Sequence, residues 1–97
     1  MKEEKQKFIP NDLRRWRKVN RLLQKQVARR LALKSTAEIS RWERGLCIPK
    51  PDNLFDLAYI YGTSAEAMYR EYLKERHQRI DAGEEQSREN VIHERTN

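Results

Sequence analysis

Apolar positions along the chain recur with the period of an α-helix in five successive segments. A first helix is expected to begin after Asn11, which can cap it, and to end near Asn20. A second helix runs from Gln24 to Leu31 or Ala32, with its apolar stripe opposite the basic side chains Lys25, Arg29 and Arg30. Both helices therefore offer one apolar face to a common core.

A third helix follows a short polar break. Ser35 or Thr36 can cap its start, and Glu38 is placed to complete a capping box. We expect this helix to end at Gly45, because a glycine takes the left-handed conformation without a steric penalty from Cβ. The side chains that it turns inward are Ile39 and Trp42.

Two more helices follow an extended connection that contains Pro49. The fourth opens within residues 52–53 and closes at Gly62, and the fifth is capped within residues 63–64 and extends to Gly83. The apolar stripe of the fifth comprises Ala65, Met68, Tyr69, Tyr72, Leu73 and Ile80. Because no segment alternates with the period of a strand, the expected fold is all-α.

These elements divide the chain into four parts. Residues 1–10 are polar and predicted to form a flexible arm, and residues 11–73 form one helical domain. Residues 74–83 are a helical extension of that domain. Residues 84–97 lack aromatic side chains, so a disordered tail is expected.

The composition argues against several classes of protein. Charged residues make up 37% of the chain, and no apolar run approaches the roughly 20 residues needed to cross a bilayer. Residues 1–7 precede no apolar stretch, which argues against a secretion signal. Cys47 alone cannot form an internal disulfide, and neither His77 nor His93 has a partner at ligand spacing. We therefore expect a cytoplasmic protein with no metal and no cofactor.

The net charge of +6 is unevenly distributed. Residues 12–50 carry twelve Lys and Arg against three Asp and Glu, a net charge of +9. Residues 51–97 carry six against ten, a net charge of −4. A basic segment of this kind is typical of a phosphate-binding surface, although a solvated basic face without a partner would have the same composition.

Residues 24–45 read QKQVARRLALKSTAEISRWERG, and a Leu-x-x-Leu-Ala pattern follows at residues 54–58. Over residues 13–69, this sequence resembles the Cro/repressor-like (XRE-type) helix-turn-helix proteins of bacteria and phages. The resemblance implies a five-helix, lambda-repressor-like DNA-binding domain, here with an extended C-terminal helix. The chain departs from the family pattern at three positions, with Arg21 and Ala32 where glycine is usual and Leu23 where serine often caps the second helix. One extra residue between the second and third helices also leaves the register at the start of the third uncertain by one position.

The third helix is expected to contact bases. Arg41 lies opposite Ile39 and Trp42, and an arginine can donate two parallel hydrogen bonds to guanine. A phosphate contact or a solvated charge is the alternative for this residue. Thr36 and Ala37 occupy positions where relatives place other base-contacting side chains, although Thr36 is also a good helix cap.

Other side chains are expected to bind phosphate or to support the fold. The resemblance implies that Gln24 binds a phosphate, and local capping alone is the alternative for this residue. It also implies that Arg17 and Glu43 form a structural ion pair between the first and third helices. The remaining phosphate candidates are Ser40, Arg44, Lys50, Lys34 and Lys25. For Lys34 and Lys25, a contribution to the positive field alone is the alternative.

The leading hypothesis is a small transcriptional regulator, a repressor, that binds double-stranded DNA as a homodimer. The fifth helix is the candidate dimer element, with a solvent-exposed extension as the alternative reading. The second hypothesis is an antitoxin or protein-interaction module whose acidic residues 66–94 bind a protein partner. An enzyme is not expected, because the sequence has no carboxylate pair, nucleophile beside a base, or phosphate-binding glycine loop.

Overall fold

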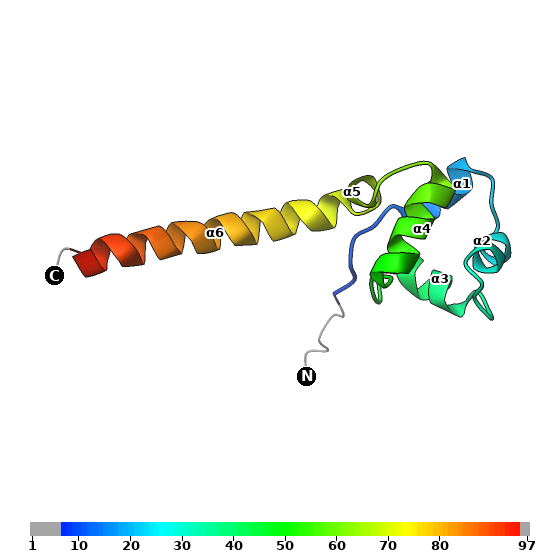
Figure 1. Cartoon of the computed structure of the whole chain (residues 1–97), viewed down its shortest axis with the longest axis horizontal. Helices are drawn as coiled ribbons and strands as arrows, with labels where there is room; N and C mark the ends of the chain where they lie inside the picture. Colours follow the sequence, from blue (N-terminus) through cyan, green and yellow to red (C-terminus); the bar gives the residue numbers. More distant parts are fainter. Residues whose placement is uncertain (1–6, 96–97) are drawn as a thin grey trace, which may run out of the picture.

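The structure is a computed structural model that describes the backbone of residues 7–95 and the side chains of residues 7–86. All regular secondary structure over these residues is helical, which confirms the expected fold class. Five helices form a compact domain and the sixth extends away from it (Figure 1). The helices are α1 (Leu13–Val19), α2 (Gln24–Arg30), α3 (Ala37–Glu43), α4 (Pro51–Tyr61), α5 (Ala65–Met68) and α6 (Arg70–Arg95).

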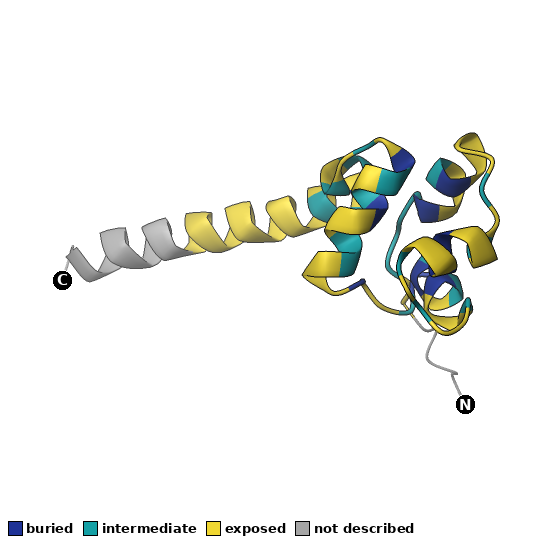
Figure 2. Cartoon of the chain, turned by 45° about the vertical axis from the view of Figure 1, so that its right-hand side comes forward, coloured by how far each residue is buried: buried dark blue, intermediate teal, exposed yellow. Residues whose placement is uncertain are grey.

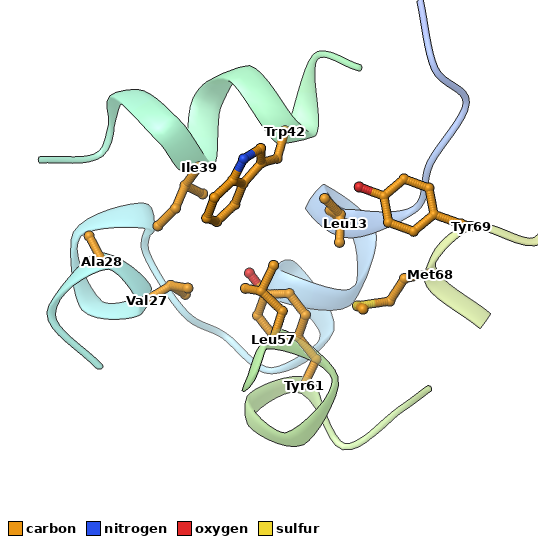
Figure 3. Packing of buried hydrophobic residues seen from close by; sticks show 9 residues of the cluster. All are labelled: Leu13, Val27, Ala28, Ile39, Trp42, Leu57, Tyr61, Met68 and Tyr69. Carbon is orange, nitrogen blue, oxygen red and sulfur yellow. The ribbon is translucent and has the colours of Figure 1, made fainter. Parts of the chain in front are cut away.

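The core lies where α1 to α5 meet. In Figure 3, Ile39 and Trp42 point from α3 toward Val27 of α2, and Leu57 of α4 lies across from them. Trp42, which the sequence predicts to turn inward, is only 4% exposed, and Trp16 packs against the same cluster, so both tryptophans belong to the core. The buried cluster comprises Leu13, Val27, Ala28, Ile39, Trp42, Leu57, Tyr61, Met68 and Tyr69.

The fifth helix predicted from the sequence is two helices in the structure. α5 ends at Met68, and Tyr69 leaves the helical conformation before α6 begins. Met68 and Tyr69 are both buried, and at the break the carbonyl of Met68 accepts a hydrogen bond from the Asp12 N–H at 2.8 Å. A tertiary hydrogen bond to the segment before α1 therefore uses a carbonyl that a continuous helix would pair with its own backbone.

Beyond the domain, α6 continues where the sequence predicted an end. Gly83 does not terminate it, and the helix runs to Arg95 across most of the segment expected to be a disordered tail. Glycine inside a helix costs only about 1 kcal/mol, so it weakens a helix without stopping it. All residues from 74 to 86 are exposed (Figure 2). Residues 96–97 of the expected tail lie outside the described part of the chain.

The two other boundary differences are small. α4 begins at Pro51, not at residues 52–53, because proline fits the first position of a helix, where no N–H donor is needed. The expected flexible arm falls partly outside the described residues, but Ile9 is anchored. Its N–H donates to the Gly45 carbonyl at 2.8 Å, and the Asn11 side chain donates to the Ile9 carbonyl at 3.1 Å.

Four of the described helices end in the same Schellman arrangement. Each is followed by a left-handed residue, with φ of 56° at Arg21 and Ala32, 76° at Gly45 and 64° at Gly62. The next N–H then donates to a carbonyl five residues earlier, as from Leu33 to Ala28 at 2.8 Å. Arg21 and Ala32 stand where the family pattern has glycine, so both carry a steric cost of roughly 1–2 kcal/mol from Cβ.

We expect Arg21→Gly and Ala32→Gly each to raise the free energy of unfolding by about 1 kcal/mol, because relief of this strain exceeds the entropy that glycine adds to the unfolded chain. Urea unfolding followed by circular dichroism measures the effect. Arg29→Gly is the matched control, since it removes the same charge from an exposed position inside α2 and should lower stability by about 1 kcal/mol. Destabilisation at both left-handed positions would contradict the prediction.

Candidate nucleic-acid interface

The centre of the candidate interface is the pair formed by α2 and α3. Val27 and Ala28 are buried on one helix, and Ile39 and Trp42 on the other, so the two inner faces hold the helices together. Ala28 is small enough to let the backbones approach. The opposite face of α3 is left uncovered, since Ala37 and Arg41 are exposed there.

The residues expected to contact bases lie on or beside that face. Arg41 and Ala37 are exposed on the side of α3 away from Ile39 and Trp42. Thr36 occupies the N-cap position, but its side chain makes no capping hydrogen bond. Ser35 caps instead, since its hydroxyl accepts from the Ala37 N–H at 3.2 Å. The Thr36 hydroxyl is therefore not committed to the helix start.

A hollow runs along each edge of α3. Gln24, Ser40 and Arg44 line the first, together with Arg14 of α1. Arg41 and Lys50 line the second, together with Glu38 and Asn53. The expected base-reading and phosphate-binding side chains are thus brought together around one helix, apart from Lys25 and Lys34, which are exposed but line neither of these two hollows.

A buried ion pair ties α1 to the end of α3. Arg17 Nε lies 2.6 Å from Glu43 Oε2, and Arg17 Nη2 donates to Glu43 Oε1 at 3.1 Å. The third contact of the guanidinium is a 2.9 Å hydrogen bond to the Leu22 carbonyl. The two side chains are only 11% and 5% exposed. Hydrogen bonding to the Glu43 carboxylate raises the pKa of Arg17 above its ordinary value, so the guanidinium stays charged.

Gln24 takes part in this network. Its amide Nε2 donates to Glu43 Oε1 at 3.0 Å, and the side chain is half-buried. The start of α2 is capped by Gln26, whose Oε1 accepts from the Leu23 N–H at 2.7 Å. The alternative of local capping alone for Gln24 is therefore wrong, because Gln26 accepts the hydrogen bond at the position that lacks the usual serine.

The sequence reasoning missed three residues of these hollows. No role was predicted for Arg14, and Asn53 was assigned only to the start of the fourth helix. Glu38 was expected to complete a capping box, yet it makes no hydrogen bond or ion pair among the described residues. The sequence did contain a signal for Glu38. It is three residues before Arg41, so the two side chains lie on the same side of a helix and can face the same surface.

The described residues contain no group of three or more His, Cys, Asp or Glu arranged to hold a metal ion. None of the helices in this part of the chain is long and apolar enough to span a membrane. The free thiol of Cys47 is exposed in the loop between α3 and α4.

Comparison with known proteins gives one match. The sequence model of the helix-turn-helix family matches residues 13–67, more than half of the chain, and this segment includes α1 to α4 and most of α5. No curated protein and no solved structure matches significantly. The matched segment contains the α2–α3 pair, both hollows and the buried ion pair. The chain therefore belongs to the Cro/repressor-like helix-turn-helix family of DNA-binding regulatory proteins.

Proposed function

We propose that this protein binds double-stranded DNA sequence-specifically through α3 and acts as a small cytoplasmic transcriptional regulator, a repressor. The observation that carries the proposal is the position of Arg41. Its side chain is exposed on the uncovered face of α3 and has no hydrogen bond or ion pair among the described residues. An unpartnered arginine on a face of this shape is suited to donate to the O6 and N7 atoms of guanine.

The residues on either side of α3 also support its proposed position in the major groove. The major groove is about 12 Å wide and admits one helix, which leaves the residues at its two edges beside the phosphates. On one edge Gln24, Ser40 and Arg44 would meet one strand, and on the other Lys50 would meet the opposite strand. Neutralising phosphates in this way supplies affinity that falls with salt concentration, whereas Arg41 supplies sequence preference.

The proposed assembly is a homodimer on a palindromic site. α6 is the candidate dimer element because it projects from the domain and Ile80 on it is 60% exposed. Tyr72 and Leu73 are already half-buried against the protein's own core, so they contribute less to a partner than the sequence indicated. Two recognition helices in such a dimer would lie about 34 Å apart, one turn of DNA.

The test is selection of bound sequences from a pool of random duplexes by the wild type and by Arg41→Ala. The wild type should enrich two inverted half-sites, each with a guanine, spaced by about one DNA turn. Arg41→Ala should lose the preference at that guanine, by about fivefold to a hundredfold. Arg15→Ala is the matched control, since it removes an exposed arginine from α1 that lines neither hollow, and should leave the selected sequence unchanged.

Three outcomes would count against this proposal or a part of it. If the wild type enriches no sequence, specific DNA recognition is wrong, and the antitoxin or protein-interaction alternative takes its place. If Arg41→Ala enriches the same sequence as the wild type, α3 is not the reading element. A single unrepeated half-site would retain DNA reading but remove the homodimer.

A further inference from the structure

Glu38 is an acidic residue in the first turn of α3, the helix proposed to enter the major groove. Its side chain is exposed and makes no hydrogen bond or ion pair among the described residues. It stands in a segment of net charge +9 that contains only two other acidic residues. One of these, Glu43, is held in the buried ion pair, so its charge is already neutralised.

Glu38 faces the same hollow as Arg41. The two residues are three positions apart on α3, and Lys50 and Asn53 line the other side of that hollow. Ile39, which follows Glu38, points into the core in Figure 3, so the helix cannot rotate to bring Glu38 inward. In helix-turn-helix proteins the N-terminal residues of the recognition helix contact the base edges. Glu38 is thus nearer to that end than Arg41 is.

A carboxylate in this place discriminates strongly between bases. It can only accept hydrogen bonds, and it is repelled by phosphates and by the acceptor atoms that guanine and thymine present in the major groove. The exocyclic amino group of cytosine is a donor that matches it. An unpaired carboxylate weakens the attraction to any DNA sequence. Its effect on recognition is therefore to disfavour sequences that offer it no hydrogen-bond donor.

We propose that Glu38 is a specificity-determining residue that accepts a hydrogen bond from the N4 amino group of a cytosine next to the base pair read by Arg41. This rests on the proposed function of α3. A carboxylate in the first turn also stabilises a helix through its dipole, but that role affects stability and leaves base preference unchanged.

The experiment is selection from random duplexes with the wild type, Glu38→Ala, Glu38→Gln and Glu66→Gln. Glu66 is the matched control because it is exposed and occupies the same second helical position, in α5, outside both hollows that flank α3. The wild type and Glu66→Gln should prefer cytosine beside the guanine by about fivefold to a hundredfold. Glu38→Ala should lose this preference, keep the guanine, and bind non-cognate duplexes more tightly.

Glu38→Gln gives the sharper result. Glutamine pairs with adenine through its N6 and N7 atoms, so the preference at this position should change from cytosine to adenine. Retention of cytosine by both Glu38 variants, while Arg41→Ala loses the guanine, would overturn the role of Glu38 and leave the proposed function standing. A wild type without any base preference would overturn both. Thermal unfolding of each variant, recorded in parallel, separates a loss of folding from a change of preference.

Discussion

Replacing Glu43 with glutamine is expected to lower the free energy of unfolding by about 3–5 kcal/mol, because it leaves the guanidinium of Arg17 buried without its counter-charge. Three nitrogen atoms of Arg17 make hydrogen bonds, two of them to the Glu43 carboxylate, and both side chains are almost fully enclosed. A small domain has a total stability of only about 5–15 kcal/mol, so a large share would be lost. Urea unfolding followed by circular dichroism measures the change.

Two further variants identify the cause of this loss. Glu38→Gln makes the same chemical change on the exposed side of α3 and should alter stability by no more than about 0.5 kcal/mol. The double replacement Arg17→Met with Glu43→Leu should recover most of the stability, since the cost of burying two charges disappears together with their attraction. Equal losses in Glu43→Gln and Glu38→Gln would contradict the prediction.

The sequence was sufficient to predict the core and the two helices that form the candidate interface. Leu13, Val27, Ile39 and Trp42 repeat with the helical period, and each of them is buried. Periodicity is a local property that follows from helix geometry, so it can be read without knowing the tertiary structure. The pairing of Arg17 with Glu43 came from the family resemblance, because the residues are 26 positions apart and no local rule connects them.

Features that depend on tertiary contacts could not be predicted in this way. At the break at Tyr69, the Met68 carbonyl accepts a hydrogen bond from the Asp12 N–H, a partner 56 positions earlier in the chain that no local pattern indicates. The hydrogen bond from Gln24 to Glu43 joins two helices, so it gave no sequence signal. From the sequence, Arg21 and Ala32 could be identified only as residues that differ from the family pattern. The structure shows that each follows a helix and has the left-handed backbone conformation.

Gly45→Ala is expected to lower the free energy of unfolding by about 3 kcal/mol, well beyond the usual effect of one methyl group. The left-handed conformation at this position, with φ of 76°, costs roughly 1–2 kcal/mol for a residue with Cβ. The added carbon would also meet the backbone carbonyl oxygen of Ile9 and lie 2.8 Å from the Ile9 nitrogen. Because these are backbone atoms, the chain before α1 must move and the hydrogen bond from Ile9 to Gly45 is lost.

Gly62→Ala is the control that separates strain from crowding. Its φ of 64° gives the same conformational penalty, but nothing lies within 4 Å of the added carbon, so a loss of only about 1 kcal/mol is expected. Amide hydrogen exchange adds a local measurement, since protection of the Ile9 N–H should disappear in Gly45→Ala and persist in Gly62→Ala. In a chain that begins at Pro10, both substitutions should cost the same, because the crowding partner is gone. If Gly45→Ala still lowers the free energy of unfolding by about 3 kcal/mol in this shortened chain, the destabilisation arises at the end of α3 itself and not from contact with the Ile9 backbone.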